Sequence, residues 1–528
     1  YSYRPLRYND SIRVIQLHCS VDDSAPILIS IWRARISDAR PEYEALSYTW
    51  GEKYPRRKIF CRNPASVLEV TQNCYSSLRR LRKDTDRYLW IDAISINQEN
   101  DIERSVQVRI MDRIFASASG VIVDLGEATP GSRLLFEELA DADADADQTR
   151  EPTGKFIRQW PNEEIIQELE YLYQRPWFSR IWVVQEAVVN PTVTVMCGTD
   201  QSSLAALESC NMGYHHGTRV TLKEDPPVLR LFHEYNSIGG LWNILLATRK
   251  LYASDPRDRV FALLSLLESN SDIRHILIDY TQSPEVIFTR VAKLLLSHTG
   301  LWLLAAARHG HTLHMPSWVP DWSQNYYCDI WGLNLQKAVE NEFSEEAEAS
   351  RTDQRDASCT KHTSHESTPK MSGYGLWPVG NHDALKVKGV RFGTIRSQSA
   401  AFSFFSFDDA EQAFLELLNI FHCRHSRIFV PPDLLAGEYG SLDFKSDLHR
   451  IASSLEPGDR FHSETIANFR TTMDNCRIFV TEHGEIGIAP QNSQEGDIVC
   501  IVRGAYSPCI LRQIPGGFWH LVSGDCFL

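Results

Sequence analysis

Short apolar runs alternate with amphipathic helical patterns along the first third of the chain. The predicted elements are, in chain order, strands at 27–32 and 43–50, a helix at 70–82, a buried strand at 88–96, a helix at 101–119 and a strand at 121–126 that ends at a glycine. Alternation of this kind is typical of an α/β sheet, in which parallel strands are joined by right-handed helical crossovers. Residues 27–126 therefore predict an α/β domain with a parallel sheet.

Helical patterns dominate the middle of the chain. A helical segment covers 163–189, and a strand at 192–198 closes the first domain. Residues 200–335 read as mainly helical, with an amphipathic helix at 286–298 and a helix at 254–267 that starts with an acidic or serine cap and a proline.

Two polar stretches and a β-rich end set the expected domain boundaries. We expect a solvated acidic insertion near 141–152 and a linker or long loop at 341–372, because both lack large apolar residues. From about residue 384 the pattern alternates and is punctuated by Gly, Pro and Asp, with a helical insert near 408–421, which predicts a small antiparallel barrel or sandwich. The expected domains are therefore an α/β domain at 1–200, a mainly helical region at 201–340, the linker at 341–372 and a β-rich domain at 373–528.

Composition narrows the class of protein. A chain of 528 residues exceeds the size of one ordinary core, and 43% hydrophobic residues exclude wholesale disorder. The formal net charge of −14 disfavours nucleic acid and anionic lipid as partners. The 12 cysteines show no metal-binding or disulfide spacing, and no apolar run is long enough to span a membrane. We expect a cytoplasmic protein with reduced thiols.

Common signatures of phosphate loops, zinc proteases and serine hydrolases do not occur in the sequence. The histidines at 215–216 and 309–314 have no partner cysteines, so we expect no metal site and no cofactor.

Polar corners follow three of the apolar strands, at 47–52, 92–98 and 124–127. Ligands of parallel α/β sheets bind beyond the carboxyl ends of the strands, so these corners predict one shared rim with a pocket. The alternative is that Gly51 and Gly126 only form tight turns and that Trp50 packs in a core. Asp92 is a rim candidate on either reading, because it follows a buried strand.

Residues 177–186, WFSRIWVVQE, place a carboxylate at the end of an apolar run. On a helix that begins near Pro176, Trp182 and Glu186 are four residues apart and share a face. An apolar neighbour raises the pKa of a carboxyl group, whereas an arginine such as Arg180 lowers it. Glu186 is therefore either a functional carboxylate or the partner of an arginine in a structural ion pair. Asp255 and Asp258 are better explained as helix-capping acids.

These segments resemble the fungal heterokaryon-incompatibility (HET) domain family. The matching blocks, in order, are YEALSYTWG (43–51), LWIDAISINQ (89–98), residues 103–126 and RPWFSRIWVVQE (175–186). The resemblance covers about residues 40–200. Ser95 stands where the family usually has Cys, and Asp124 stands where Trp is typical.

The resemblance implies both a fold and an activity. HET proteins trigger programmed cell death after fusion of unlike fungal cells, and their domain is similar to Toll/interleukin-1 receptor (TIR) domains, which have a flavodoxin-like fold and in many cases hydrolyse NAD. Glu186 falls on the catalytic glutamate of the WxxxE motif that begins at Trp182. The same overlay assigns nucleotide binding to rim residues that it aligns with the first strand of a TIR domain or that complete the rim: Ser47, Trp50, Gly51, Glu52, Asp92, Asn97 and Trp182.

NAD cleavage needs a carboxylate but no acid. Nicotinamide leaves as a neutral molecule, so the group that needs stabilisation is an oxocarbenium-like ribose. We therefore predict an effector of cell death with NAD nucleosidase activity at Glu186, acting with copies of itself or a partner protein. The alternative is a non-enzymatic, self-associating signalling module, in which Trp182 and Glu186 are structural residues. In either case the C-terminal regions are candidates for ligand recognition or for restraint of the first domain.

Overall fold

The structure is a computed structural model that describes residues 1–139, 163–209, 240–264, 278–307, 313–324, 375–399, 476–502 and 507–524, apart from a few positions within these ranges, together with short pieces between them. Contacts divide the chain into two compact units, Tyr1–Ser283 and Pro284–Leu528. The predicted insertion at 141–152, the predicted linker at 341–372 and the helical insert near 408–421 lie outside the described residues.

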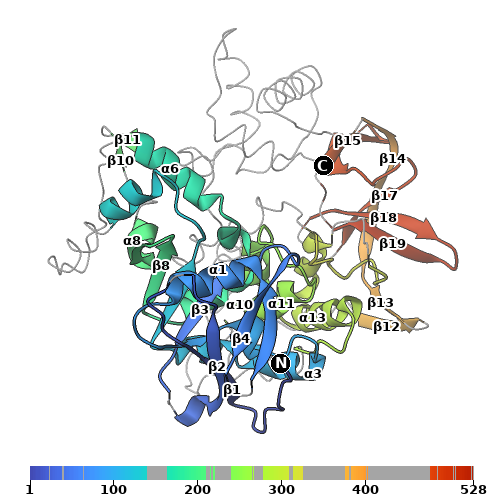
Figure 1. Ribbon diagram of the computed structural model, residues 1–528. Coiled ribbons are helices and arrows are strands. Elements are labelled where there is room, and N and C mark those ends of the chain that lie inside the picture. Colours follow the sequence, from blue (N-terminus) through green and yellow to red (C-terminus); the bar gives the residue numbers. More distant parts are fainter. Residues whose placement is uncertain are drawn as a thin grey trace, which may run out of the picture. The chain divides into compact units, whose positions relative to one another are not determined.

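A nine-stranded mixed sheet forms the centre of the first unit (Figure 1). Its spatial order is β5-β4-β2-β1-β6-β3-β7-β8-β9. The strands are β1 (Ser11–Leu17), β2 (Leu28–Arg35), β3 (Glu44–Tyr48), β4 (Arg56–Cys61), β5 (Ser66–Thr71), β6 (Arg87–Trp90), β7 (Gly120–Asp124), β8 (Val193–Cys197) and β9 (Asp200–Ser203).

Parallel pairing is confined to part of this sheet. β3 pairs in parallel with β6 and with β7, and β7 pairs in parallel with β8; β2 and β4 form a separate, short parallel pair. The pairs β1–β2, β1–β6, β4–β5 and β8–β9 are antiparallel. The predicted α/β class is thus confirmed, but the sheet is mixed. The N-terminal hairpin of β1 and β2 was missed in part, because residues 1–17 were not assigned a strand.

The helices of the first unit follow the predicted amphipathic segments. They are α1 (Gln72–Leu81), α2 (Asp92–Ser95), α3 (Asp101–Arg109), α4 (Met111–Ala116), α6 (Glu163–Tyr173), the 3₁₀ helix η2 (Pro176–Ser179), α7 (Trp182–Val188), α8 (Leu204–Ser209), α10 (Gly240–Ala247) and α11 (Asp258–Leu264). α1 begins as predicted at a threonine: Thr71 Oγ1 accepts a hydrogen bond from the amide of Cys74 and so caps the helix. α1 contacts β3, β4 and β5 and buries Leu78 and Leu81.

Two predicted elements are broken where the sequence pattern is continuous. The strand expected at 88–96 ends at Trp90, and α2 starts at Asp92, whose carboxylate accepts a hydrogen bond from the amide of Ala93. The helix expected at 101–119 is interrupted at Ile110, which joins α3 to α4. In both cases the apolar residues stay buried across the break, so the hydrophobic pattern alone did not reveal it.

A third correction concerns the helix expected from Pro176. Proline begins η2, a 3₁₀ turn, and the chain becomes extended at Arg180 before α7 starts at Trp182. The break places Trp177 on a different side from the one that a continuous helix would give it.

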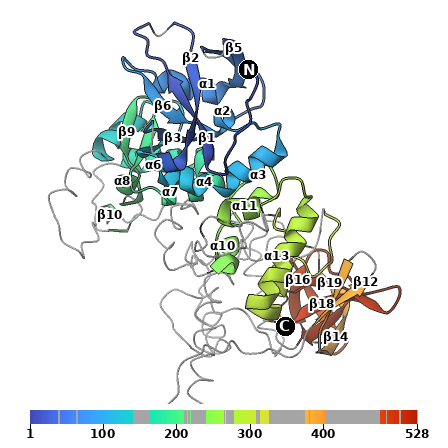
Figure 2. The same ribbon diagram turned by 90° about the horizontal axis from the view of Figure 1, so that it is seen from below.

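The second unit combines helices with an antiparallel sheet (Figure 2). Its elements are α13 (Pro284–Thr299), the 3₁₀ helix η4 (Gly300–Ala306), and strands β12 (Gly375–Val379), β13 (His382–Lys386), β14 (Gly389–Gln398), β15 (Cys476–Thr481), β16 (Ile486–Pro490), β17 (Ile498–Val502), β18 (Cys509–Ile514) and β19 (Phe518–Ser523). Six strands form one antiparallel sheet in the order β16-β15-β14-β17-β18-β19. The predicted antiparallel β-rich end is confirmed, and β16 and β19 are the edges of the sheet among the described strands.

Core residues of the C-terminal sheet include Ile395, Phe479, Val499 and Ile510, all nearly inaccessible to solvent. The cysteines that the structure describes are free thiols, most of them buried. Within the described residues, every helix is too short or too polar to traverse a lipid bilayer.

Candidate functional site

Two consecutive hydrogen bonds link Trp177 through Ser47 to Glu186. The indole Nε1 of Trp177 donates to Ser47 Oγ at 2.8 Å, and Ser47 Oγ in turn donates to Glu186 Oε2. Ser47 lies near the carboxyl end of β3, and Glu186 lies on α7. All three residues are at most 3% exposed.

The direction of these bonds follows from the groups themselves. An indole N–H can only donate, so the Ser47 oxygen must accept from Trp177 and use its own proton toward Glu186. Glu186 Oε2 is therefore an acceptor, as an ionised carboxylate is. Ser47 holds this oxygen in place from the tip of the parallel sheet.

Arg180 is the cation of the cluster. Its Nη1 donates to the carbonyl of Tyr48 and lies 3.7 Å from Glu186 Oε2. Burial raises the pKa of the Glu186 carboxyl above its ordinary value, and the charge of Arg180 and the hydrogen bond from Ser47 oppose that shift. Both effects expected from the sequence, an upward shift of the Glu186 pKa by burial and a downward shift by Arg180, are therefore present.

A second carboxylate, Asp92, lies in the same electrostatic environment. Trp50 Nε1 donates to Asp92 Oδ2 at 2.8 Å, and Gln98 Nε2 donates to the Asp92 carbonyl at 2.9 Å. Burial raises the pKa of Asp92, and Arg180 lowers it. Asp92 also raises the pKa of Glu186. Arg180 thus lowers the pKa of two carboxylates, Asp92 after β6 and Glu186 on α7.

The remaining rim candidates differ in their surroundings. Gly51 has a positive φ of 73°, and a Cβ there would lie 2.6 Å from Asn73 Nδ2, so the tight-turn reading holds for this glycine. Glu52 is exposed. The Asn97 side chain accepts a hydrogen bond from the amide of Glu99, whereas Asp92 is contacted by the side chains of Trp50 and Gln98.

Trp182 does not form a hydrogen bond with Glu186, although both lie on α7. Its Nε1 donates to Asp258 Oδ2 at 3.0 Å, at the start of α11. Tyr280 donates its hydroxyl proton to the other oxygen, Asp258 Oδ1. The indole that belongs to the Glu186 cluster is that of Trp177, a residue to which the sequence analysis gave no role.

Asp258 is more than a helix-capping acid. Burial raises its pKa to about 6, and the hydrogen bond from Tyr280 works in the opposite direction. The Tyr280 ring is in turn covered by Arg104, whose Cζ lies 3.9 Å from the ring centroid. Asp255, by contrast, forms the expected local contacts, because it accepts from the amide and the guanidinium of Arg257.

The sequence holds a weak signal for these contacts. Pro176 is a signal for the start of a new helix. A 3₁₀ turn and an extended residue separate Trp177 from Trp182, so the two indoles lie on different sides. Tyr280 gave no signal, because its contact with Asp258 spans 22 residues.

At the end of the neighbouring strand β7, Asp124 lies opposite Tyr48 in the parallel register. Arg80 Nη2 binds its carboxylate at 2.6 Å, and the amide of Gly126 donates to it at 2.9 Å. This carboxylate is therefore neutralised from α1 and shapes the turn after β7. No group of three or more potential metal ligands occurs among the residues that the structure describes.

These features define a class of protein: an α/β domain with a buried polar cluster at the carboxyl ends of adjacent parallel strands. Residues 43–186 match the model of the family described as heterokaryon incompatibility protein (HET). This match agrees with the resemblance that the four motifs indicated, and the matched range starts just before β3 and ends at Glu186 itself.

One curated relative is heterokaryon incompatibility protein 6, OR allele, of Neurospora crassa, which is 27% identical over 412 residues. The alignment covers 61% of this chain and 60% of the relative. No solved structure matches the chain.

Proposed function

We propose that this protein acts in heterokaryon incompatibility and that its HET domain does so by hydrolysing NAD to nicotinamide and ADP-ribose, with Glu186 as the essential carboxylate. The HET domain and the named relative support the biological role. The observation that carries the chemical part is the convergence of Ser47, Arg180 and Asp92 on Glu186 at the strand ends.

The order of the parallel strands supports the TIR-like part of the proposal. Along the chain, the four strands β3, β6, β7 and β8 are first, second, third and fourth. Across the sheet they lie in the order β6, β3, β7, β8, which is second, first, third, fourth. This is the order of flavodoxin-like sheets, in which ligands bind at the switch point between the first and third strands. Here that point lies between β3 and β7, and β3 carries Ser47.

The proposed reaction balances without an added acid. The bond between ribose C1′ and the nicotinamide nitrogen breaks, and its electron pair neutralises the nicotinamide ring. The Glu186 carboxylate stabilises the positive charge that develops at C1′. Water then adds to C1′, and its proton leaves through the carboxylate to solvent. Asp92 and Trp50 are placed to contact the ribose or the nicotinamide once the site is open.

Access sets a condition on this proposal. Glu186 is 3% exposed, whereas Trp50, hydrogen-bonded to Asp92, is 36% exposed. NAD therefore reaches the carboxylate only if the corner after β3 moves away from α2. We propose that self-association or a partner protein produces this opening in the cytoplasm, in line with the assembly that a cell-death trigger requires.

The test compares two substitutions of Glu by Gln on the purified full chain. Glu186→Gln keeps the shape of the side chain but removes its charge. Glu44→Gln is the matched control, because Glu44 lies on the same sheet at the start of β3 and pairs with Arg87. Release of nicotinamide by the parent and by the control, with at least a hundredfold loss in Glu186→Gln, supports the proposal. Equal release by all three proteins, or none by an assembled parent, contradicts it.

One observation favours a second candidate function, a non-enzymatic signalling module. The contacts of Glu186 with Ser47 and Arg180 are those of a buried structural network. In that case Glu186→Gln retains cell killing and self-association when expressed in a fungal host. Loss of killing with assembly intact assigns the role to chemistry instead.

A further inference from the structure

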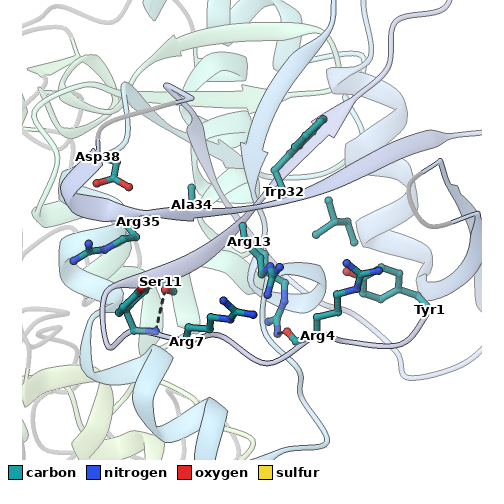
Figure 3. Close-up of a pocket in the computed structure, with 12 residues that line it drawn as sticks. Tyr1, Arg4, Arg7, Ser11, Arg13, Trp32, Ala34, Arg35 and Asp38 are labelled. Atoms are coloured by element: carbon teal, nitrogen blue, oxygen red, sulfur yellow. Dashed lines mark hydrogen bonds between the residues drawn. The ribbon is translucent and has the colours of Figure 1, made fainter.

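A positively charged groove of about 590 Å³ lies in the first unit, between the N-terminal segment and strands β1 and β2 (Figure 3). Five arginines line it together with a single aspartate: Arg4, Arg7, Arg13, Arg33, Arg35 and Asp38. We call this the arginine groove. Such a concentration of positive charge is unexpected in a chain whose net charge is −14.

Two of the five arginines are neutralised. The guanidinium of Arg13, whose side chain is 1% exposed, pairs with Glu103 at 2.6 Å and also donates to the carbonyl of Ser95. Arg35 pairs with Asp10 at 3.0 Å. These two contacts attach the sheet to α3 and to the turn before β1, so both arginines have a structural role.

The other three arginines have no acidic partner. Arg4, Arg7 and Arg33 are exposed, and none forms an ion pair within the part of the chain that the structure describes. Asp38, at the rim, offers one negative charge against these three positive ones. The groove thus retains a net positive charge that Asp38 offsets only in part.

The register of the sheet makes this arrangement unfavourable for stability alone. Arg13 and Arg33 lie directly opposite each other in the β1–β2 pair. Like charges at such positions destabilise a sheet, and only Arg13 is compensated by a carboxylate. The contact that Arg33 does make is a long, exposed hydrogen bond from Nη1 to the carbonyl of Pro5 at 3.5 Å, which leaves its charge uncompensated. A bound anion therefore explains Arg33 better than packing does.

The N-terminal segment holds the other two arginines at the groove. Arg13 Nη2 donates to the carbonyl of Arg4 at 2.7 Å, and the amide of Tyr8 donates to Ser11 Oγ at 3.2 Å, so both ends of residues 4–8 are attached to β1. In Figure 3, Arg4 and Arg7 approach from this segment on the side of the strands where Arg13 lies, whereas Trp32 points away from them.

We propose that the arginine groove binds a small molecule through a chain of two or three phosphates. Guanidinium groups match phosphate geometry with paired N–H donors, and three of them can surround an anion with several charges. The volume is in the range of small-molecule sites. The aromatic residues of the lining are otherwise engaged: Trp32 points away, Tyr8 lies under the guanidinium of Arg35, and Tyr1 packs edge-on against Tyr3. Recognition therefore falls on the phosphates and not on a nucleobase. The groove shares no lining residue with the Glu186 cluster, so this proposal does not depend on NAD hydrolysis.

Calorimetric titration of the full-length chain tests the proposal with three probes: tripolyphosphate, ATP and adenosine. Tripolyphosphate and ATP are expected to bind with a stoichiometry of one, with affinity that falls as salt rises, and adenosine is not. Arg33→Gln and Arg7→Gln should each weaken tripolyphosphate binding about tenfold or more. The matched control is Arg113→Gln, an exposed arginine of α4 outside the groove, which should bind like the parent.

Thermal unfolding without ligand provides the second readout. Arg33→Gln is expected to unfold at or above the temperature of the parent, because the change removes the like-charge pair, so weaker binding cannot be attributed to misfolding. Equal affinity of Arg33→Gln and Arg113→Gln for tripolyphosphate would overturn the proposal. So would binding of ATP without binding of tripolyphosphate, because the nucleoside would then be the recognised group.

Discussion

Helix α7 contributes to two buried acidic clusters that differ in how the carboxylate is neutralised. Glu186 has a guanidinium within 4 Å, since Arg180 Nη1 lies 3.7 Å from its oxygen. Asp258 instead receives two neutral donors, the indole of Trp182 and the hydroxyl of Tyr280. The same helix thus places one carboxylate beside a fixed positive charge and supports another without one.

The difference shows what each cluster is suited for. Burial raises the pKa of Asp258 to about 6, so its charge changes near physiological pH. Burial also raises the pKa of Glu186, but Arg180 favours the charged form. Arg180, bound to the carbonyl of Tyr48 at the end of β3, gives the Glu186 cluster the paired charges that the proposed function requires, whereas the neutral donors around Asp258 join α7 to α11.

The largest expected effect distinguishes the two indoles. Trp177 is 1% exposed, and Trp177→Ala should lower the free energy of unfolding by about 3–5 kcal/mol, because it leaves a cavity and removes the donor to Ser47. Trp182 is half-buried, so Trp182→Ala should cost about 1–3 kcal/mol. Urea titrations followed by circular dichroism measure both. Equal losses would mean that the two clusters contribute alike to the core.

Arg180→Gln tests the cation of the Glu186 cluster. The change removes the positive charge that stabilises the ionised forms of Glu186 and Asp92. It should lower the free energy of unfolding by about 2–4 kcal/mol at pH 7, since the Arg180–Glu186 pair is mostly buried. Without Arg180 the folded-state pKa of Glu186 rises further above its unfolded value. The loss of stability in Arg180→Gln is therefore largest at neutral pH, where Glu186 is ionised. It shrinks as the pH falls through the folded-state pKa of Glu186 and the carboxylate is protonated.

Arg104→Gln is the matched change in the Asp258 cluster. Arg104 covers the Tyr280 ring and forms an exposed ion pair with Asp101, so its loss should cost about 1 kcal/mol. Urea titrations of both variants at pH 7 and pH 5 provide the measurement. A deficit of Arg180→Gln that does not depend on pH would show that Glu186 is not charged in the parent.

Asp258→Asn isolates the pH dependence of the second cluster. The folded-state pKa of Asp258, about 6, exceeds the ordinary value for Asp, so its ionisation destabilises the fold above pH 6 and the penalty is relieved as the pH falls. Between pH 7 and pH 5 the parent should gain about 1 kcal/mol relative to the variant. Unfolding midpoints across this range measure the gain, and parallel curves would contradict the raised pKa.

Trp50→Phe has the smallest expected effect. The change removes one hydrogen bond to Asp92 from a partly exposed indole, which should cost less than about 1 kcal/mol. The same bond lowers the pKa of Asp92, so that pKa should move upward in the variant. Nuclear magnetic resonance of the labelled carboxyl group follows this shift, and a downward movement would argue against the contact.

Local patterns predicted elements that depend on short-range physics. Thr71 caps α1 as its sequence position indicated, and the apolar runs at 43–50, 121–126 and 192–198 became β3, β7 and β8. The order of parallel strands and the antiparallel hairpin at the N-terminus were not predicted, because pairing depends on which edges meet in space. Residues 11–17 alternate strongly enough to have indicated β1.

Candidate residues show the same division. The sequence drew attention to Glu186, Asp92 and Trp50, because a carboxylate after an apolar run and an aromatic residue at a strand end are unusual. It paired Glu186 with Trp182, whereas the folded chain brings Ser47 and Trp177 to Glu186. The partners lie up to 139 residues away, and no local pattern encodes a contact at that separation.

The sequence by itself indicated the resemblance to the HET family, the α/β class, the β-rich end and the carboxylate at position 186 as a candidate. The resemblance follows from four ordered motifs, and the rest follows from hydrophobic period and local capping, which act over a few neighbouring residues. The tertiary structure decided which indole joins that carboxylate, which arginine faces it, and that three arginines without an acidic partner among the described residues converge on one groove. These outcomes depend on sheet register and on the break at Pro176, which bring distant side chains together only when the whole unit is folded.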